Sequence, residues 1–384
     1  MKQAADGPIV IVGGGIIGMS IAHHLAEAGH PEVVVVERGQ VGEGATAAAT
    51  GGIRQQFTSR INVELVRDSI KFYRHFEDRV GAPLDLRQHG YLFLVDKQEA
   101  LDSLAAGVEL QRSLGVPTEL LTPERVVDIF PEVRTDDLVG ATYCPTDGSA
   151  SPTDAVAGLA LSCRRLGVRV IENAEVSGLK RDASRHVRAV TASGGSIEAC
   201  SVVIATGPIA AETGRRLGVD IPVKPYRRQA FAISPLPWLE PGRPFTVDLG
   251  TGAYLHPEVA GGVIGGTDRD VPSSMNTAVD WDRLEPLVAA LASRLPRMVE
   301  ATVSRGWAGL REMTPDDHAL LGPVQGQPSL WIAAGFSGHG FMQAPTVGRE
   351  LAAWLLRGAP ELDLTPLDPN RFKQGVSGSE AVKF

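Results

Sequence analysis

Cysteine is scarce in this chain of 384 residues. There are three cysteines, Cys144, Cys163 and Cys200, which are too few and too widely spaced for a disulfide framework or for the ligand set of a zinc site. The sequence therefore predicts no metal site, and it indicates a reducing compartment, the cytoplasm.

Long apolar runs are also missing. The longest, residues 8–22, contains four glycines and is shorter than the about 20 residues that a membrane-spanning helix needs. It also lacks the small-residue cleavage region of a signal peptide. We expect a protein without a transmembrane segment.

Basic residues are not in excess. The chain has 37 Lys and Arg residues against 45 Asp and Glu residues, and its formal charge of −8 argues against a nucleic-acid-binding protein. Glycine is the residue in excess, with 43 positions, and the excess lies in short clusters between apolar runs. Such clusters are typical of backbone that approaches a ligand closely.

The first glycine cluster belongs to a dinucleotide-binding pattern. The apolar run at residues 9–12 predicts a strand buried on both faces, and a G-x-G-x-x-G motif follows it at residues 13–18. A helix and a second buried strand at 33–36 come next, and that strand ends at Glu37. This acid lies 19 residues after the last glycine of the motif, close to the ~20 residues usual for an acid that binds the ribose.

Each part of this pattern has a role in binding a dinucleotide. Gly13 allows the tight turn, Gly15 lets the backbone approach the pyrophosphate, and Gly18 allows close contact between helix and strand. The free N–H groups of the helix N-terminus attract the phosphates. The cofactor residues that we expect here are Gly13, Gly15, Ile16, Gly18, Glu37 and Arg38.

The run of small residues within 41–57 favours FAD over NAD. Small side chains permit close approach of the backbone to a long, flat ligand, and a simple NAD dehydrogenase has no need of such a run. The residues that we expect to contact FAD in this run are Ala45, Thr46, Gly51 and Gly52.

Four motifs, in order along the chain, carry a family resemblance. They are GGIRQQF (51–57), IATGPIA (204–210), WAGLREMTPDDHALLGP (307–323) and GFSGHGFMQAPTVGRELAAWLL (335–356). On these motifs the chain resembles the D-amino-acid-oxidase-like flavoproteins, the group of glycine oxidase, sarcosine oxidase and dye-linked proline dehydrogenase. The resemblance covers residues 9 to 371 and implies FAD as the cofactor.

The C-terminal motif predicts a helix that begins near Gly340 after a glycine-rich entry. The N-terminus of this helix would stabilise the negative charge that the flavin pyrimidine gains on reduction, by about 0.3–2 kcal/mol. The remaining cofactor residues that we expect are Val176, Thr206, Gly207, Gly309, Gly335, Ser337, Gly338, His339, Gly340 and Phe341.

The resemblance implies an α/β fold with a Rossmann-type FAD-binding domain and a discontinuous substrate-binding domain on a mixed or antiparallel sheet. The expected FAD-binding domain comprises residues 1–80, 145–220 and 315–372, and the substrate-binding domain comprises 81–144 and 221–314. The sequence itself predicts strands at 90–95 and 229–233 and a helix over 280–295. Residues 373–384 are expected to form a mobile tail.

An amino-acid substrate calls for a guanidinium, whose planar fork matches two carboxylate oxygens. Arg311 follows Gly309 and Leu310 in the loop where glycine-oxidase-like proteins place their carboxylate-binding arginine. The alternative for Arg311 is a structural ion pair with Glu312 or Asp316.

Three more residues are candidates for the catalytic site. By the resemblance, Arg54 lies near the flavin ring and Tyr254 lines the substrate pocket. A salt bridge is the alternative for Arg54, and simple packing on a strand is the alternative for Tyr254. His339, between two glycines, is expected to face the flavin ring as a hydrogen-bonded histidine.

The chain departs from the family at positions that bear on its flavin. Covalent members attach FAD through a cysteine in the stretch that corresponds to residues 307–314, where this chain has none, and heterotetrameric sarcosine oxidases carry a second flavin on a histidine where this chain has Thr153. We therefore expect one noncovalent FAD. The lysine that activates oxygen in monomeric sarcosine oxidases is missing from residues 261–266, which favours a dehydrogenase or an oxidase that uses another cation.

We expect an FAD-dependent oxidoreductase that oxidises a small amino or imino acid (glycine, sarcosine, proline or a relative) by hydride transfer to flavin N5. The electrons would pass to oxygen or to another acceptor. One alternative is a 2-hydroxy-acid or glycerol-phosphate dehydrogenase of the same superfamily. Another is a flavin-holding assembly protein without turnover, since GGIRQQF also resembles a mitochondrial complex I assembly factor. Homo- and hetero-oligomers both stay open.

Overall fold

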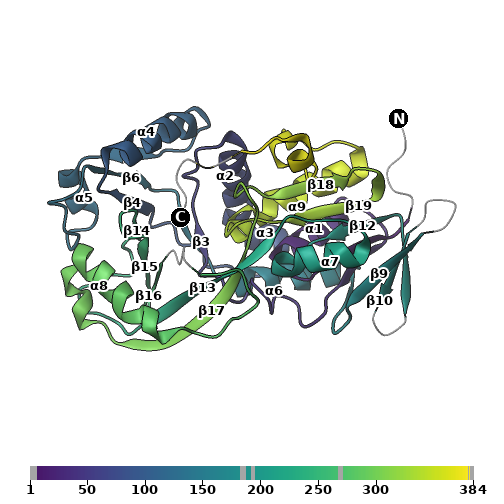
Figure 1. Cartoon of the computed structure of the whole chain (residues 1–384), viewed down its shortest axis with the longest axis horizontal. Coiled ribbons are helices and arrows are strands. Elements are labelled where there is room, and N and C mark those ends of the chain that lie inside the picture. Colours follow the sequence, from purple (N-terminus) through teal and green to yellow (C-terminus); the bar gives the residue numbers. More distant parts are fainter. Residues whose placement is uncertain (1–6, 182–186, 192–194, 267–270, 379, 381–384) are drawn as a thin grey trace.

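Two large sheets of different type lie side by side along the long axis of the molecule (Figure 1). The computed structural model describes residues 7–181, 187–191, 195–266, 271–378 and 380. The long strands β13 (Lys224–Ile233) and β17 (Val303–Met313) belong to the second sheet and reach to the middle of the molecule. Strands β13 and β17 of the second sheet therefore help to bound the space between the two sheets.

The first sheet has six strands and is almost entirely parallel. In spatial order they are β18 (Leu320–Val324), β19 (Gln327–Ala334), β12 (Ser201–Ile204), β1 (Ile9–Val12), β2 (Val33–Val36) and β8 (Arg169–Ile171). Only the pair of β18 and β19 is antiparallel. Along β1, Ile9 and Ile11 pack into one hydrophobic core, and Val10 and Val12 pack into another. Successive side chains point to opposite faces of a strand, so this apolar run needs a cover on both faces.

Helices cover one face of the first sheet, and a mixed layer covers the other. The helical face carries α1 (Ile16–Glu27), α2 (Arg60–Arg74), α3 (Phe76–Val80), α6 (Pro152–Arg165) and α9 (Gly340–Arg357). The opposite face carries α7 (Ala210–Leu217) and the antiparallel strands β9 (Val176–Arg181), β10 (Val187–Thr191) and β11 (Ser196–Ala199). Short 3-10 turns occur at η1 (Gly207–Ile209), η2 (Trp281–Arg283), η3 (Pro296–Glu300), η4 (Thr365–Leu367) and η5 (Arg371–Gln374).

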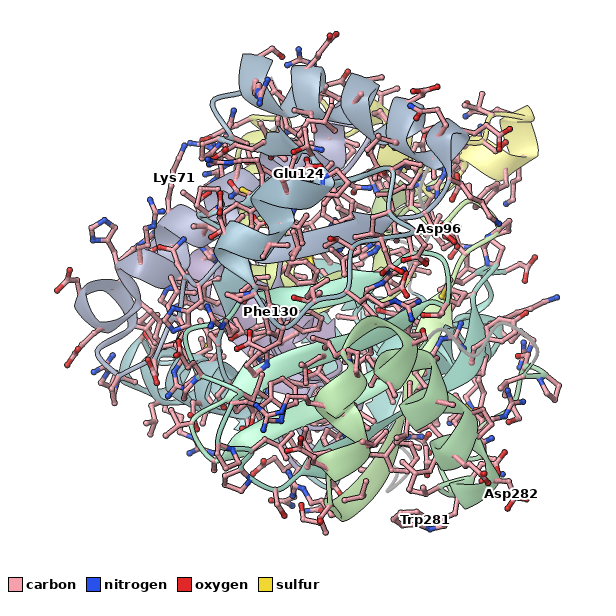
Figure 2. All side chains as sticks on the ribbon, turned by 90° about the vertical axis from the view of Figure 1, so that its left-hand side faces the viewer. Lys71, Asp96, Glu124, Phe130, Trp281 and Asp282 are labelled. Carbon is pink, nitrogen blue, oxygen red and sulfur yellow. The ribbon has the colours of Figure 1, made fainter. Side chains whose placement is uncertain are left out.

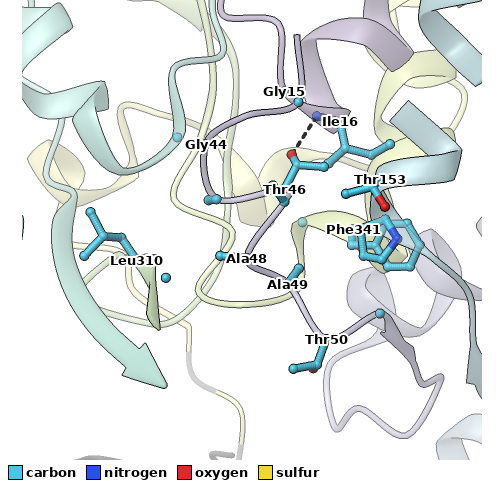
Figure 3. A pocket seen from close by; sticks show the side chains of 18 of the residues that line it. Gly15, Ile16, Gly44, Thr46, Ala48, Ala49, Thr50, Thr153, Leu310 and Phe341 are labelled. Carbon is cyan, nitrogen blue, oxygen red and sulfur yellow. Dashed lines mark hydrogen bonds between the residues drawn. The ribbon is translucent and has the colours of Figure 1, made fainter. Parts of the chain in front are cut away.

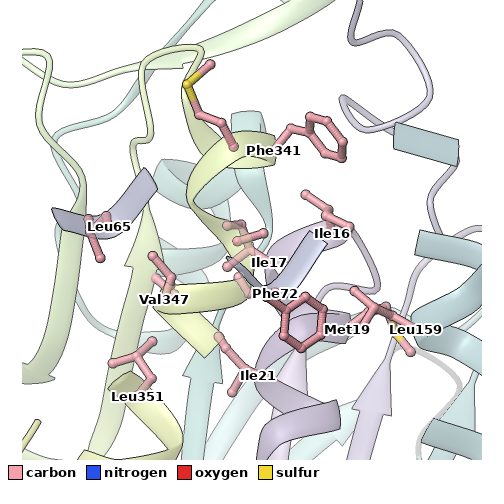
Figure 4. Close-up of a cluster of buried hydrophobic side chains, with 14 of the residues drawn as sticks. Ile16, Ile17, Met19, Ile21, Leu65, Phe72, Leu159, Phe341, Val347 and Leu351 are labelled. Atoms are coloured by element: carbon pink, nitrogen blue, oxygen red, sulfur yellow. The ribbon is translucent and has the colours of Figure 1, made fainter. Parts of the chain in front are cut away.

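Helices α1 and α9, from opposite ends of the sequence, pack directly on each other (Figure 4). Ser20 Oγ donates a 2.7 Å hydrogen bond to the carbonyl oxygen of Ala344. A Cβ atom on Gly348 would lie 2.3 Å from Ser20 Oγ and 2.7 Å from the Ser20 backbone. Glycine at position 348 is therefore a condition of this close approach.

The second sheet has eight strands and is mixed, with one parallel pair. In spatial order they are β17, β13, β16 (Gly261–Gly266), β15 (Ala253–Glu258), β14 (Phe245–Asp248), β4 (Tyr91–Val95), β6 (Gly140–Cys144) and β5 (Glu119–Leu121). The parallel pair is β14 and β4. A two-stranded ribbon of β3 (Gly52–Ile53) and β7 (Gly148–Ser149) lies apart from both large sheets.

The outer face of the second sheet is covered by α5 (Pro123–Ile129) and α8 (Leu284–Arg294). Helix α4 (Gln98–Ser113) packs instead on Val95, which lies on the same side of β4 as Tyr91 and Phe93. Figure 2 shows this end of the molecule, with Glu124 on α5 and Trp281 at the rim. Phe130, which follows α5, is fully buried in the core beneath α5 and α8. The other face carries aromatic side chains and is directed toward the first sheet.

The α/β fold class predicted from the sequence is confirmed. The strand predicted at 90–95 is β4, the strand predicted at 229–233 is the second half of the longer β13, and the helix predicted over 280–295 begins as the 3-10 turn η2 before α8. The domain boundaries stay a prediction. No helix within the described residues is long and apolar enough to cross a membrane.

Residues 373–378 of the tail, which we expected to be mobile, are exposed, but Gly378 and Glu380 bond to the rest of the chain. Gly378 N donates to Asp316 Oδ2 at 3.2 Å, and Glu380 is only 5% exposed. Residue 379 and residues 381–384 lie outside the described residues. Composition indicated a solvated segment, whereas Glu380 finds hydrogen-bond donors at the start of α2.

The contact of α1 and α9 predicts the effect of one added methyl group. Gly348→Ala should destabilise the protein by about 1–3 kcal/mol, because the methyl group would overlap the backbone of Ser20. Gly242→Ala is the matched control, since no atom lies within 4 Å of a Cβ there, and it should stay within about 0.5 kcal/mol of the wild type. Urea denaturation measures both, and equal midpoints for the two variants would contradict the packing argument.

Candidate functional site

A cavity of about 1390 Å³ runs between the two sheets (Figure 3). One end lies at the turn between β1 and α1, and the other at the aromatic face of the second sheet. The volume exceeds the about 300–1,000 Å³ of an ordinary small-molecule pocket. The cavity therefore has room for a large cofactor together with a second, small ligand.

The glycine turn at the start of α1 is shaped so that no side chain fits. Gly13 has a φ of +112°, and a Cβ on it would lie 2.3 Å from the carbonyl oxygen of Ala205. A Cβ on Gly18 would lie 1.9 Å from the carbonyl oxygen of Gly13. Gly13, Gly15 and Ile16 line the cavity, whereas Gly18 lies behind the turn and allows its shape. The N–H groups of the first turn of α1 thus face a space that suits a phosphate.

Glu37 lies at the end of β2, as the spacing predicted. Its Oε2 accepts a 2.7 Å hydrogen bond from Gly14 N, and its Oε1 accepts one of 2.8 Å from Gly39 N. These bonds fix the carboxylate at the cavity wall next to Arg38, which also lines it. Each carboxylate oxygen keeps a lone pair for a ribose hydroxyl.

The small-residue run forms the wall between the two sheets. Thr46 Oγ1 accepts a 3.1 Å hydrogen bond from Ile16 N, the dashed line of Figure 3. Trp307 Nε1 donates to the carbonyl oxygen of Ala48 at 3.1 Å, and a Cβ on Gly309 would lie 2.5 Å from the Ala48 Cβ. Ala45, Gly51, Gly52 and Gly309 line the cavity with this run.

A buried hydroxyl group without a partner lies at the same end of the cavity. Thr206 Oγ1 has no hydrogen-bond partner among the described residues, although it is shielded from solvent. Thr206, Gly207 and Val176 line the cavity. An unmet buried hydroxyl is costly, so this group is placed for a ligand atom.

The loop before α9 forms the opposite wall. Gly335, Ser337 and Gly338 all have positive φ, at +75°, +53° and +92°. Ser337 N donates to the carbonyl oxygen of Glu312 at 2.9 Å, which braces the loop on β17. Gly338, His339, Gly340 and Phe341 line the cavity, whereas Gly335 and Ser337 do not, so these two shape the loop from behind.

Arg311 lies on β17 and points along this loop. A Cβ on Gly338 would lie 2.7 Å from Arg311 Nε, so glycine there leaves room for the guanidinium. The two acids that could have paired with Arg311 have other bonds. Asp316 forms 2.8 Å and 2.9 Å hydrogen bonds with Arg371, and Glu312 Oε2 accepts from Gly335 N at 3.0 Å.

Arg54 and His339 are brought together in the cavity wall. Arg54 Nη2 lies 3.2 Å from His339 Nε2, and Arg54 Nη1 donates to the carbonyl oxygen of Gln56 at 2.8 Å. Burial and the charge of Arg54 hold the pKa of His339 well below its ordinary value, so the neutral ring accepts at Nε2. No carboxylate of the described residues lies within 4.0 Å of Arg54, so a direct salt bridge is not formed there.

Aromatic side chains line the end of the cavity at the second sheet. Phe245 stacks on Tyr91 at 4.3 Å, on His256 at 4.8 Å and on Tyr254 at 5.3 Å, measured between ring centroids. Burial lowers the pKa of His256 to about 4, so this ring is neutral. A Cβ on Gly265 would lie 2.3 Å from the Tyr254 hydroxyl oxygen.

Sequence reasoning missed Tyr91 and Phe245, because nothing local distinguishes them from packed strand residues. It also missed Glu312, which is half-buried at the cavity wall. Burial raises the pKa of Glu312 to about 7, against the opposing effect of the backbone N–H groups of Gly335 and Phe336.

This arrangement defines a class. Two helix N-termini and an acid after the second strand line one part of the cavity and suit a dinucleotide, and a guanidinium and an aromatic wall line another part. Such a site is that of an oxidoreductase with a bound dinucleotide. Residues 8–354 match the family model for FAD dependent oxidoreductase (DAO), and the chain belongs to this family.

Relatives and solved structures agree with the family. The chain is 30% identical over 371 residues to glycine oxidase of Geobacillus kaustophilus, covering 94% of this chain and 96% of that protein. It is 31% identical over 387 residues to mitochondrial dimethylglycine dehydrogenase of Rattus norvegicus, but covers only 44% of that protein. The chain therefore spans less than half the length of that relative. The structure of L-proline dehydrogenase from P. horikoshii superposes with a TM-score of 0.90 at 32% identity, covering 98% of this chain and all of that one.

FAD fits the residues that line the cavity. The Gly13 turn, which excludes a Cβ because it would collide with the carbonyl oxygen of Ala205, places backbone at the cavity wall, Thr206 offers an unpartnered hydroxyl, and Glu37 lines the cavity as the ribose-binding acid would. FAD is the cofactor on which this family depends.

We expect the hydroxyl group of Thr206 to contribute part of the affinity for FAD. Thr206→Val should raise the dissociation constant for FAD about 2- to 10-fold, because one hydrogen bond to the cofactor is lost. Thr118→Val is the control, because it removes another buried hydroxyl that is unpartnered among the described residues but lies outside the cavity. This variant should leave the dissociation constant for FAD unchanged. Titration of the apoprotein with FAD measures both. An unaltered dissociation constant in Thr206→Val would exclude this contact.

Glu312 predicts a pH-dependent stability. Its pKa is higher in the folded protein than the ordinary value of 4.5, so the ionised form is disfavoured by folding and costs stability above about pH 7. Glu312→Gln should raise the melting temperature by about 2 °C or more at pH 8, and this gain should vanish as the pH falls toward 5. The exposed Glu285→Gln is the control and should show no such trend. A gain that is equal at pH 5 and pH 8 would contradict the burial argument.

Proposed function

We propose that this protein oxidises the C–N bond of a small amino or imino acid and uses noncovalently bound FAD. The observation that carries the proposal is the guanidinium of Arg311, which lies against the loop that begins α9, in the same cavity as the dinucleotide site. Its planar fork suits a carboxylate. The related proteins glycine oxidase, dimethylglycine dehydrogenase and L-proline dehydrogenase support an amino-acid substrate.

The FAD-binding residues would act at two separate places. The N-terminus of α1 with Gly13 and Gly15 would hold the pyrophosphate, and Glu37 would bind the ribose hydroxyls. The N-terminus of α9, entered through Gly338 to Gly340, would stabilise negative charge on the pyrimidine ring. No cysteine lies at 307–314 and Thr153 precedes residues 154–156, which supports noncovalent binding.

The residues at the end of the cavity next to the second sheet would bind and orient the substrate. Arg311 would hold the carboxylate, and Arg54, fixed by His339 and by the carbonyl of Gln56, would form the neighbouring wall. The aromatic wall of Tyr91, Phe245 and Tyr254 would exclude water and pack against the substrate side chain. When bound, FAD supplies the chemistry that accepts a hydride from the substrate carbon beside the amine. The imine product then hydrolyses in water.

The electron acceptor is either oxygen or another molecule, and the sequence of the chain favours an acceptor other than oxygen. Residues 261–266 contain no lysine, and the hydroxyl of Tyr254 lies where a side chain at Gly265 would extend. A cation near the flavin stabilises the superoxide anion that forms when oxygen is reduced. Its absence from this strand supports a dehydrogenase, or an oxidase in which another cation of the cavity, such as Arg54 or Arg311, takes this role.

The division of the chain follows the two sheets. We propose that residues 1–80, 145–220 and 315–372 form the FAD-binding domain and that residues 81–144 and 221–314 form the substrate-binding domain. The strands of the six-stranded sheet fall within the first set, and those of the eight-stranded sheet fall within the second.

The substrate class is tested by anaerobic addition of amino, imino and 2-hydroxy acids while the flavin absorption is followed. We expect bleaching by at least one small amino or imino acid. Bleaching by a hydroxy acid but not by its amino analogue would replace the proposal with the hydroxy-acid alternative. No bleaching by any of them, in a protein that retains its flavin, would exclude the proposed reaction.

Arg311 has its own test. Arg311→Lys should lower kcat/KM by about tenfold or more, because a point charge replaces a two-pronged donor, while the FAD content stays unchanged. Arg297→Lys, on the surface beside Glu300, is the control and should behave as the wild type. Wild-type kinetics for Arg311→Lys would remove this residue from the site.

A further inference from the structure

The segment 54–59 joins β3 to α2 and carries Arg54 into the cavity. Its first four side chains, Arg54, Gln55, Gln56 and Phe57, are all at most 5% exposed. Three of these four are polar, and buried polar groups must find partners inside the protein. The partners of this segment are therefore informative.

Asp147 holds the first half of the segment. Its Oδ1 accepts hydrogen bonds from Gln55 N at 2.9 Å and from Gln55 Nε2 at 3.0 Å, and its Oδ2 accepts from Gln56 Nε2 at 3.1 Å. Asp147 is fully buried just before β7. One carboxylate thus fixes two consecutive glutamines through three bonds.

Gln56 connects this carboxylate to Arg54. Its carbonyl oxygen accepts from Arg54 Nη1 at 2.8 Å. Its side-chain amide is fully engaged, since Nε2 also donates to the carbonyl oxygen of Tyr91 at 2.9 Å and Oε1 accepts from Thr142 Oγ1 at 2.7 Å. A rigid Gln56 leaves the Arg54 guanidinium little freedom to turn.

Glu380 holds the second half of the segment. Its Oε2 accepts from Thr58 N at 2.7 Å and from Thr58 Oγ1 at 2.6 Å, and its Oε1 accepts from Ser59 Oγ and from Asn62 Nδ2. His318 Nε2 lies 3.7 Å from the same carboxylate. A carboxylate at the N-terminus of α2 also interacts favourably with the helix dipole.

These two acids also counter the burial of the Arg54 charge. Burial and the neighbouring Arg311 lower the pKa of Arg54, whereas Tyr91, Glu380 and Asp147 raise it. Neither acid forms an ion pair with Arg54 within 4.0 Å. They act on it from either end of the segment, and Arg54 itself lines the cavity.

We infer that Asp147 and Glu380 are positioning residues, which clamp the segment 54–59 at both ends and hold Arg54 in one orientation for a carboxylate-bearing substrate. This inference rests on the proposed function, because it assigns Arg54 to the substrate compartment. The glutamines of GGIRQQF then have a role, as the links between the clamp and the arginine.

The clamp has a pH dependence. Burial raises the pKa of Asp147 to about 6, against the hydrogen bonds from Gln55 and Gln56. The ionisable groups that face Asp147 are Arg54 on the segment 54–59, Tyr91 on β4, and Tyr143 and Cys144 on β6. Below about pH 6 the carboxyl gains a proton, and a hydrogen-bond acceptor for the glutamines becomes a donor. Carboxylate binding should therefore weaken as the pH falls through 6.

The test uses the FAD-loaded protein and acetate, which carries a carboxylate but no amine. Acetate binding is followed through the flavin absorption between pH 5 and 8, together with steady-state kinetics on the best amine substrate. Asp147→Asn should raise the acetate dissociation constant about tenfold or more at pH 7.5, and Glu380→Gln about threefold or more, with unchanged FAD content. The rise in KM should exceed the fall in kcat, and the weakening of acetate binding below pH 6 should disappear in Asp147→Asn.

Asp248→Asn is the matched control. Asp248 is 3% exposed and lies 3.4 Å from Arg294 Nε, but it is outside the cavity, so its loss should lower stability and leave acetate binding unchanged. If Asp147→Asn fails to fold, Glu380→Gln decides the question with the same readouts.

Wild-type acetate affinity and an unaltered pH profile in a folded Asp147→Asn, or wild-type affinity in Glu380→Gln if the first variant is lost, would overturn the inference. A different result would separate the two proposals. If acetate binding weakens in the variants as expected but no amine bleaches the flavin, the clamp is supported and the proposed reaction is excluded. A wild-type protein that does not bind acetate at all would remove the carboxylate site and the clamp with it.

Discussion

The close contact between α1 and α9 is the constraint on which the site depends. The two helices belong to opposite ends of the sequence, and each begins at the cavity with a glycine-rich turn. Gly348 lets α9 approach the backbone of Ser20, and the hydrogen bond from Ser20 to Ala344 fixes the distance. Because both N-termini open on one space, positive electrostatic potential from two helix dipoles reaches a single ligand. A dinucleotide with phosphates at one end and a redox-active ring at the other suits that arrangement.

The second sheet contributes what the helices cannot. Its strand β17 brings Arg311 and Glu312 beside the loop before α9, and the pairing of β17 with β13 fixes their register, with Arg311 opposite Tyr226. The strands β4, β14 and β15 present stacked rings to the same space. The proposed phosphate and substrate sites therefore lie on separate layers of structure, which are joined by direct bonds such as that from Ser337 N to the carbonyl oxygen of Glu312.

Much of the fold could be predicted from the sequence, since its signals are local. The turn at residues 13–18, the buried strands around it and the helix after Gly340 each follow from spacing within about 30 residues. The parts that could not be predicted depend on contacts across the chain. Asp147 reaches back some 90 residues to Gln55, and Glu380 more than 300 to Thr58. The position of Glu380 in the tail could not be predicted either. The polar composition of the tail is typical of a solvated segment, and the hydrogen-bond donors for Glu380 lie at the start of α2, far away in the sequence. Among the candidate site residues, Gly18, Gly335 and Ser337 matched the motif but support the cavity from behind, because a motif records backbone shape as well as ligand contact.

Tyr254 and Gly265 face each other across the pairing of β15 and β16. The phenol fills the volume that any larger residue at position 265 would need, since an added Cβ would lie 2.3 Å from its oxygen. The two positions are thus mutually exclusive in size, and mutations at them are epistatic. An ancestor could exchange a bulky 254 for a bulky 265 only through an intermediate that is small at both. Across the family, these two sites should covary in volume, and a change of electron acceptor that needs a charge on β16 would first require a smaller residue on β15.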